Sequence, residues 1–422
     1  MKLPYKEILK NNTVKNGIWL YILQFFNTVF PLLTLPYVTR ILGTNGYGIF
    51  SYALNIITYL QVIVEYGFNL SGAREIAIQE SEKEREKIYS RVVTAKLLLL
   101  SITIILTIGI IIVCHFSYEQ TLTIIIMFLI VVGTAFTQTW LFQGKQKMKF
   151  VTISNSVIRI IFMLLIFLFV KEKEDLFIYS FLYAIVFLVI GIAQTFIIRK
   201  FFNYKYKICN FKECCKELKN GWYTFTTSAM SKVFTGISVT ILGIINGSDA
   251  SVVGIYSAIQ KIPVAINMVY TPVGQAIFPY ISKKYGIDYK FSMKLIKKLI
   301  KLVFLCMIIA IIVVLFFSYD IIKIAFGIEY TQYHLVLIPL IVWAFLGILN
   351  NLLGVQILVA QGKNKEYSEA FIISCISIVV LNIIFGILWN IYGVAIATML
   401  SELILSISLI KKIFFKKKKE EV

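Results

Sequence analysis

Charged residues are scarce in this chain of 422 residues: Asp, Glu, Lys and Arg make up 15% of it, whereas 59% is hydrophobic and 15% aromatic. A soluble domain of this length is about half apolar and about a quarter charged. The mean hydropathy, +0.82, points the same way. The composition therefore excludes an ordinary soluble fold and predicts an integral membrane protein.

Histidine and cysteine are also rare. The two histidines, His115 and His334, are isolated in the sequence. Among the six cysteines, Cys209, Cys214 and Cys215 lie close together, but no histidine is nearby and their spacing matches no zinc-binding pattern. We recognise no Ser-His-Asp or Cys-His arrangement and no glycine loop with a phosphate-binding lysine. The sequence thus predicts neither an enzyme nor a resident cofactor or metal.

Long apolar segments recur along the chain. A bilayer core of about 30 Å needs roughly 20 apolar residues per helix. We predict an all-α integral membrane protein with twelve transmembrane helices, at 17–36, 46–70, 92–113, 121–142, 150–170, 176–198, 221–246, 252–282, 299–318, 334–360, 368–388 and 391–410. Because twelve is even, both termini lie on the same side of the membrane.

The net charge of +20 is unevenly distributed. Of the 42 Lys and Arg residues, 35 fall in seven segments that alternate with segments containing only four: Arg40, Lys171, Lys173 and Lys323. Basic loops stay in the cytoplasm, so both termini are predicted to be cytoplasmic. Orientation and attraction to anionic lipid explain this charge, and no nucleic-acid partner is predicted. The basic segments are the N-terminus, 71–96, 145–149, 199–219, 283–301, 363–365 and the residues from 411 onward.

Two short motifs recur in the second half of the chain. GIFSYA at 48–53 matches GIYSA at 254–258, and QGKQK at 143–147 matches QGKNK at 361–365. Each motif occupies the same place in a half of six spans, so the halves share one orientation and are related by an axis along the membrane normal. We therefore predict two six-helix lobes, 1–208 and 209–422, with a substrate site near the midplane between them.

Polar residues form stripes on some predicted spans. A polar stripe on a membrane helix must face protein or water, because lipid cannot satisfy it. On the second span the stripe lies within about 40° of one line, at 100° per residue. It consists of Ser51, Asn55, Thr58, Glu65 and Asn69. Its counterpart on the eighth span includes Gln260, Lys261 and Asn267, and the seventh span contributes Lys232.

Six charged residues lie within or beside the spans: Arg40, Glu65, Arg159, Lys232, Lys261 and Glu402. A charge at mid-bilayer costs about 2.5–3.5 kcal/mol, so it persists only against water, a partner or a ligand. Two cations remain for an anionic ligand if both carboxylates are paired internally. We predict a cationic substrate cavity, in which Arg40 contributes least because it can extend to lipid headgroups.

Two alternatives to this cavity stay open at this point. The charges could form internal ion pairs, Arg159 with Glu65 and Lys261 or Lys232 with Glu402. Glu65 and Glu402 could instead be coupling sites that exchange a proton or a sodium ion.

Prolines are few, and six of the seven lie in or beside predicted spans. Each removes a backbone donor and is expected to bend or break its helix. These six are Pro31, Pro36, Pro263, Pro272, Pro279 and Pro339.

The segment TRILGTNGYG at 39–48, followed by YGF at 66–68 and AREIA at 73–77, resembles the N-terminal region of polysaccharide flippases. These are Wzx-type members of the multidrug/oligosaccharidyl-lipid/polysaccharide exporter superfamily, and the resemblance covers essentially the whole chain. It implies a bacterial plasma-membrane protein that moves an undecaprenyl-diphosphate-linked oligosaccharide from the cytoplasmic to the outer leaflet by alternating access. Its partners would be this lipid-linked glycan, membrane lipids and other glycan-assembly membrane proteins.

The resemblance also implies roles for individual residues. By location, Lys232, Lys261 and Arg159 would engage the diphosphate and sugar. Where relatives often have aspartate near the end of the second span, this chain has Glu65.

Two other functions are compatible with this architecture. A multidrug or small-molecule cation antiporter of the same superfamily would be expected to have a net acidic cavity. A polysaccharide polymerase would need a sizeable outer loop with catalytic side chains, and the longest predicted here, near 319–333, has about 15 residues.

Overall fold

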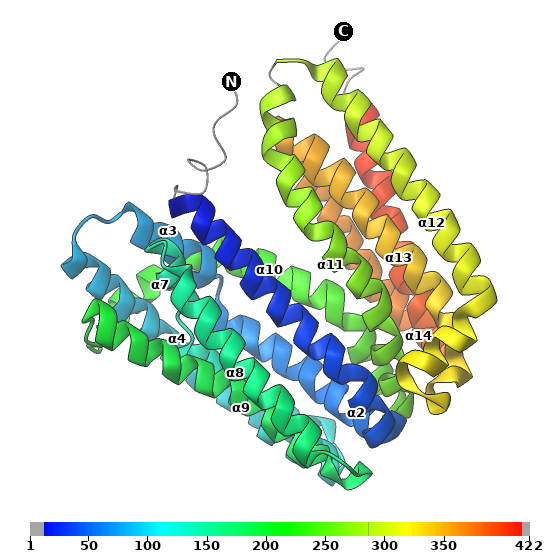
Figure 1. Ribbon diagram of the computed structural model, residues 1–422, viewed down its shortest axis with the longest axis horizontal. Coiled ribbons are helices and arrows are strands. Elements are labelled where there is room, and N and C mark those ends of the chain that lie inside the picture. The colour runs from blue at the N-terminus through cyan, green and yellow to red at the C-terminus, as the bar shows by residue number, and fades with distance from the viewer. Residues whose placement is uncertain (1–11, 286, 416–422) are drawn as a thin grey trace. The chain divides into compact units, whose positions relative to one another are not determined.

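The structure is a computed structural model that describes residues 12–285 and 287–415, and every regular element within those ranges is a helix (Figure 1). The chain divides into two compact units, Met1–Val233 (unit 1) and Phe234–Val422 (unit 2). Ten described segments are long and apolar enough to cross a membrane. The predicted all-helical membrane fold is confirmed, whereas the lobes 1–208 and 209–422 stay a prediction.

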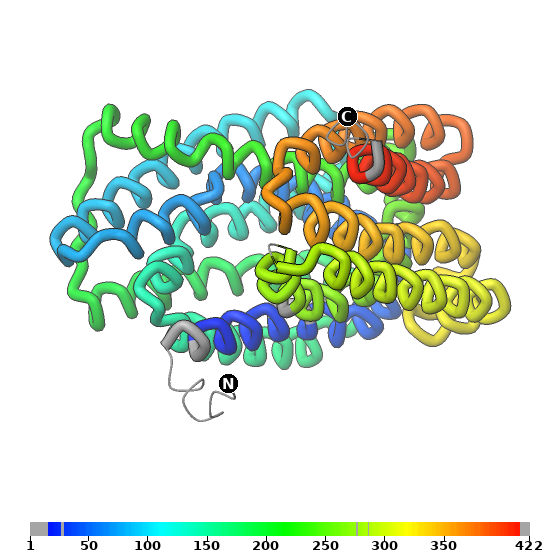
Figure 2. Tube along the Cα trace, turned by 90° about the horizontal axis from the view of Figure 1, so that it is seen from above, coloured from blue at the N-terminus to red at the C-terminus, as the bar shows by residue number. Residues whose placement is uncertain are grey.

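Unit 1 is a bundle in which α2 packs against α8, α8 against α9, and α9 against α6 (Figures 1 and 2). Short helices connect these long ones. The elements are α2 (Asn12–Glu65), α3 (Phe68–Ile78), α4 (Glu82–Cys114), α5 (Tyr118–Met127), α6 (Leu129–Phe136), α7 (Thr139–Gly144), α8 (Met148–Phe169), η1 (Lys173–Asp175), α9 (Leu176–Ile197), η2 (Ile198–Phe202) and the first part of α10 (Phe211–Asn246).

Unit 2 contains the end of α10 and four long helical segments that pack side by side. They are α11 (Ser251–Tyr285), α12 (Tyr289–Phe326), α13 (Leu337–Asn350) and α14 (Asn364–Phe415). η3 (Ile328–Val336) connects α12 to α13, and η4 (Asn351–Leu358) and η5 (Val359–Gln361) connect α13 to α14. The predicted outer loop near 319–333 is thus mostly helical, because α12 runs on to Phe326 and η3 follows after Gly327.

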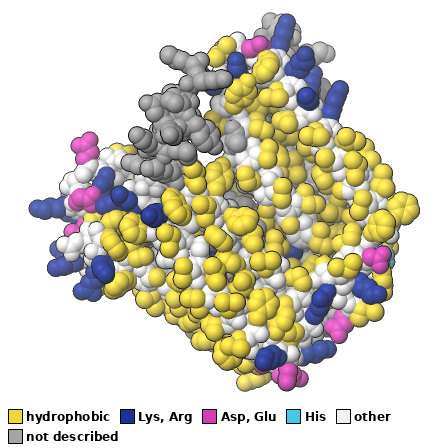
Figure 3. All heavy atoms as spheres, viewed as in Figure 1, with side chains coloured by type: hydrophobic (Ala, Val, Ile, Leu, Met, Phe, Trp, Pro, Cys, Tyr) yellow, Lys and Arg dark blue, Asp and Glu magenta, His cyan; other side chains and the backbone are white. Residues whose placement is uncertain are grey.

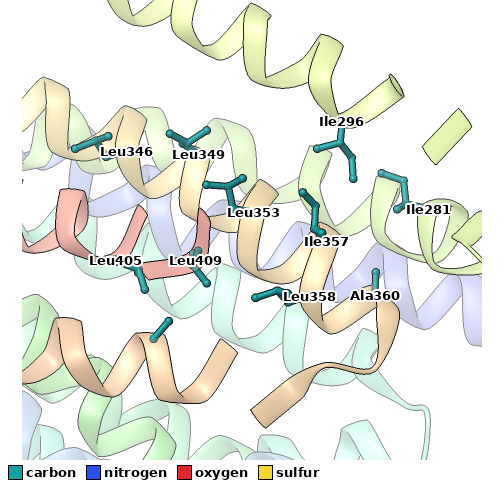
Figure 4. Packing of buried hydrophobic residues seen from close by; sticks show 11 residues of the cluster. Ile281, Ile296, Leu346, Leu349, Leu353, Ile357, Leu358, Ala360, Leu405 and Leu409 are labelled. Carbon is teal, nitrogen blue, oxygen red and sulfur yellow. The ribbon is translucent and has the colours of Figure 1, made fainter. Parts of the chain in front are cut away.

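A buried apolar cluster holds unit 2 together (Figure 4). Leu346, Leu349, Leu353 and Ile357 follow one another along α13 and η4, so this continuous helical rod supplies much of the cluster. Leu358 of η4 and Ala360 of η5 continue this rod. The other members come from the helices around it: Ile281, Ile296, Ala370, Leu405 and Leu409.

The outer faces of the helices are apolar. In the most hydrophobic window of Tyr289–Phe326 only 6% of the residues are buried inside the protein, although the mean hydropathy there is 3.2. Hydrophobic side chains likewise cover much of the face seen in Figure 3, while lysine and arginine gather near helix ends. Exposed apolar surface of this extent is stable in lipid and would aggregate in water.

Two helices are interrupted by a single residue. α2 has 54 residues and leaves helical geometry at Gly43, where φ is 65°. α14 has 52 residues and does so at Asn390, where φ is 49°. Asn390 and Asn246 exchange side-chain hydrogen bonds of 2.9 and 3.2 Å, which fix the second interruption. Each helix is long enough for two crossings, since an unbroken 52-residue helix would measure about 78 Å.

Prolines do not cause these interruptions. α2 continues through Pro31 and Pro36, and α11 continues through Pro263, Pro272 and Pro279. A membrane helix tolerates proline where neighbouring groups satisfy the freed carbonyls. Residues that adopt a positive φ, glycine and asparagine, mark the breaks instead.

Gly133 allows α6 and α9 to approach closely. A Cβ atom at position 133 would lie 2.4 Å from the carbonyl carbon of Phe187 and 2.5 Å from the amide nitrogen of Leu188. Small residues at helix interfaces permit such backbone approach in membranes.

We expect Gly133→Ala to lower the free energy of unfolding by about 1–3 kcal/mol, because the added methyl group must push two backbones apart. Thermal unfolding in detergent measures the effect. Gly109→Ala is the matched control, since no atom lies within 4 Å of a Cβ built at Gly109. Equal melting temperatures for the two variants would contradict the close approach of α6 and α9.

Candidate functional site

Unit 1 contains a cluster of three charges on three helices. Glu65, at the end of α2, interacts electrostatically with Lys96 of α4 and Lys232 of α10. The Lys96 side chain is 3% exposed, and its Nζ donates to the carbonyl oxygens of Thr134 and Thr137 at 3.1 and 2.6 Å. Two cations therefore face one carboxylate, and the cluster as a whole carries positive charge.

Lys96 is a residue that the sequence analysis missed, because it was counted with the cytoplasmic segment 71–96. The structure buries it within α4. A signal was present: Val92, Val93 and Ala95 precede it, and Leu97 follows. A lysine surrounded by apolar residues on a spanning helix needs an internal partner, and here it finds two carbonyls and a carboxylate.

Arg159 lies elsewhere in unit 1, on α8. Its guanidinium carbon is 5.5 Å from the centre of the Phe187 ring, which is within cation–π range. Its Nε is buried, and no described residue accepts a hydrogen bond from it. Arg159 lines a cavity of about 40 Å³ with Tyr183 and Thr34. The cavity has room for a water molecule or two, so this cation is available to a small polar group.

The remaining predicted residues of unit 1 lie on α2. Arg40 is exposed, three residues before the interruption at Gly43. Asn55 is partly buried. The alternative pairing of Arg159 with Glu65 does not occur, because Arg159 lies against aromatic rings and Glu65 faces lysines.

In unit 2, Lys261 is a partly buried residue of α11, next to the partly buried Gln260. No described residue of unit 2 forms an ion pair or a hydrogen bond with its ammonium group. The surrounding protein shields this cation from water. The alternative pairing of Lys261 with Glu402 is therefore wrong.

Glu402 of α14 is buried, 7% exposed, and is held by amide and hydroxyl groups. The Asn350 Nδ2 donates to the Glu402 carboxylate and, at 2.9 Å, to its backbone oxygen. Ser406 Oγ in turn donates to Asn350 Oδ1 at 2.7 Å. Asn350 thus orients a carboxylate that has no cationic partner among the described residues of unit 2.

Asn267 and Glu402 face the same point on α13. A Cβ built at Gly347 would lie 3.7 Å from Asn267 Oδ1 and 3.8 Å from Glu402 Oε1. The structure therefore brings these two predicted residues to the same place on α13.

The motif residues of unit 1 have structural roles. The Tyr66 ring stacks on the Phe225 ring, with centres 4.5 Å apart and planes 8° apart. Gly67 has φ 72°, and a Cβ there would lie 2.6 Å from Thr224. Tyr66 and Gly67 therefore dock the end of α2 on α10.

An ionic network lies near the helix ends of unit 1. Arg91 of α4 pairs with Glu75 of α3 at 2.7 Å and with Glu217 of α10 at 2.8 Å. Nearby along α4, Glu82 pairs with Lys145 at 2.7 Å and accepts a hydrogen bond from Tyr204. Burial and this bond raise the pKa of the Tyr204 hydroxyl, so it stays protonated and remains a donor.

A family model described as polysaccharide biosynthesis protein matches residues 13–284. The chain is also 32% identical over 362 residues to the protein of Escherichia coli (strain K12) named "Putative O-antigen transporter", covering 85% of this chain and 86% of that one. The chain belongs to the polysaccharide biosynthesis protein family. A family member of the same name from Shigella dysenteriae is 34% identical over 286 residues, 67% of this chain and 70% of that one.

Solved structures share the fold of this family member. The structure titled "Lipid II flippase MurJ, inward closed conformation" superposes with a TM-score of 0.71 at 17% identity, covering 95% of this chain and 87% of that one. An inward-facing multidrug resistance MATE family transporter of the MOP superfamily gives 0.66 at 14%, covering 93% and 94%. As a member of its family, the chain is a multi-pass membrane transporter rather than an enzyme.

Proposed function

We propose that the chain is a flippase that carries an undecaprenyl-diphosphate-linked oligosaccharide repeat unit from the cytoplasmic to the outer leaflet of the bacterial plasma membrane. The observation that carries the proposal is the ammonium group of Lys261, a partly buried cation to which no described residue of unit 2 bonds. The names of the relatives, O-antigen transporter and lipid II flippase, support the same class of substrate.

The chemistry follows from the polarity of the substrate. A diphosphate attached to sugars cannot cross hydrocarbon unaided, because charged groups lose their hydration there. Lysine and arginine replace this hydration with charge-assisted hydrogen bonds. We assign the diphosphate and the sugar attached to it to Lys232, Lys261 and Arg159. The neutral residues Asn55, Gln260 and Asn267 would bind sugar hydroxyls, and Arg40 would act at the outer mouth.

We propose a topology of twelve spans in two six-helix lobes, 1–208 and 209–422, with both termini in the cytoplasm. The interruptions at Gly43 and Asn390 support this number, because each turns one of the ten apolar segments into two potential crossings. Alternating access would then result from movement of the lobes around a shared site.

Of the two carboxylates, Glu402 is the better candidate for coupling transport to a proton or sodium gradient. Glu65 faces two lysines, so neutralising its carboxylate would give up two favourable electrostatic interactions. Glu402 has an amide partner and no described cation in unit 2, so it can bind and release a cation without breaking an ion pair.

The second candidate function is a small-molecule cation antiporter. Glu402 is the specific observation in its favour, because a buried carboxylate without a cationic partner could bind an organic cation. The shared fold with a multidrug transporter is compatible with it. Against it stands the excess of lysine and arginine over carboxylates among the spans.

Reconstitution in vesicles separates these two functions. We expect the purified chain to expose a fluorescently labelled undecaprenyl-diphosphate glycan to a membrane-impermeant quencher faster than empty vesicles do, because the cationic groups lower the barrier for the diphosphate. The same vesicles should not accumulate a fluorescent organic cation. Accumulation of the organic cation without movement of the glycan would reject the flippase and support the antiporter.

A further inference from the structure

The start of α12 carries a stripe of five exposed lysines: Lys290, Lys294, Lys297, Lys298 and Lys301. At 100° per residue they fall within a sector of about 100°, so they form one face of the helix. Among the described residues, no carboxylate pairs with any of them. The nearest acid along the chain, Asp288, caps the helix by accepting from the Phe291 amide at 2.9 Å.

These lysines line a groove of about 830 Å³ whose other walls are largely apolar. Phe291 and Leu295 come from α12 itself, and Ile413 comes from α14. The groove therefore combines ammonium groups with aliphatic and aromatic surface. Figure 3 shows basic side chains gathered at the end of unit 2 where α12 begins.

The groove continues into the apolar face of α12. After Lys301 the helix has no lysine or arginine until Lys323, and only 6% of its most apolar window is buried inside the protein. The five lysines thus lie where a lipid-facing helix leaves the hydrocarbon. If the anion bound there is a lipid headgroup, the acyl chains of that lipid can lie along the apolar face of α12.

The groove is distinct from the site proposed around Lys261. Lys261 lies near the start of α11, and the groove adjoins the other end of that helix, where the Tyr285 and Tyr289 rings are 5.7 Å apart. The 24 residues from Lys261 to Tyr285 span about 36 Å of helix. The substrate diphosphate cannot occupy both places at once.

We infer that this groove is a binding site for the headgroup of an anionic phospholipid. Clusters of four to eight basic residues beside a membrane helix attract such lipids, and lysine binds phosphate as a compact point charge. The apolar walls would contact the upper part of the acyl chains. The assignment of this lipid to the cytoplasmic leaflet rests on the proposed topology. The chemistry of the groove is independent of that topology.

Native mass spectrometry of the purified full chain tests the inference. We expect the protein to retain phosphatidylglycerol over phosphatidylcholine. Combining K290Q, K294Q, K297Q, K298Q and K301Q should weaken phosphatidylglycerol binding about tenfold or more, as expected for loss of a basic cluster. The matched control also loses five exposed lysines, none of which lines this groove, through K205Q, K207Q, K212Q, K216Q and K219Q. It should bind as the unchanged chain does.

Three outcomes would overturn the inference: equal retention of the two lipids, equal loss of binding in both variants, or full displacement of phosphatidylglycerol by inorganic diphosphate at equal concentration. The last would indicate a general anion site. If the groove variant unfolds, a variant with the five Lys→Arg replacements is tested instead. It keeps the positive charge and should therefore keep the preference for phosphatidylglycerol over phosphatidylcholine. Retained glycan flipping with lost lipid preference separates this site from the transport site.

Discussion

Lys261→Ala is expected to reduce glycan flipping about tenfold to a hundredfold while the protein remains folded in the membrane. A hydrogen bond to a charged group contributes about 1.5–3 kcal/mol, and about 1.4 kcal/mol corresponds to a factor of ten. The ammonium has no described partner in unit 2, so its removal breaks no ion pair with a described residue of that unit. The loss should therefore fall on the substrate. Flipping of the labelled glycan by the reconstituted variant measures it.

Two further variants make this result specific. Lys261→Arg keeps the charge and should retain much of the activity, which a loss of packing alone would not explain. Arg40→Ala removes an exposed cation and should have the smallest effect of the predicted site residues. Wild-type flipping in Lys261→Ala, alone and combined with Lys232→Ala, would refute the cationic site.

Glu402→Gln is expected to abolish the dependence of flipping on an imposed proton or sodium gradient. Glutamine has the shape of a protonated glutamate and can still accept the hydrogen bond from Asn350, so the surroundings should be kept. It cannot exchange a proton or attract a cation. Flipping in vesicles with and without each gradient measures this loss.

Glu65→Gln is the matched comparison for this variant. It removes the carboxylate that faces Lys96 and Lys232, leaving two cations without their counter-charge. We expect it to lower thermal stability, because the buried Lys96 would lose its counter-charge, and to leave gradient dependence in place. Persistence of gradient stimulation in Glu402→Gln, with its loss in Glu65→Gln, would exchange the two assignments.

The sequence was sufficient to predict the helical membrane fold, because apolar composition and helix length follow directly from the bilayer. It was less informative about where helices break. Prolines were expected to bend or break their helices. α2 and α11 continue through theirs, and the residues that leave helical geometry are Gly43 of α2 and Asn390 of α14. A break depends on whether neighbouring groups satisfy the freed backbone, and that depends on packing.

The charged residues illustrate the same limit. Their presence within spans was evident from the sequence, but their partners were not. Pairing depends on how each helix is rotated, so Glu65 faces Lys96, which had been assigned to a loop, and Arg159 lies on Phe187. Asn267 and Glu402, on two different helices, approach the same place on a third helix, Gly347.

Arg91 has a mechanical consequence. One guanidinium serves carboxylates on two helices, Glu75 of α3 and Glu217 of α10, and Glu217 is only 4% exposed. If α10 were to swing away from α3 during a transport cycle, an acid now shielded from water would lose its counter-ion at the same moment. An intermediate position of α10 would therefore be energetically unfavourable. The contact that Arg91 makes between α3 and α10 should therefore be either fully formed or fully broken.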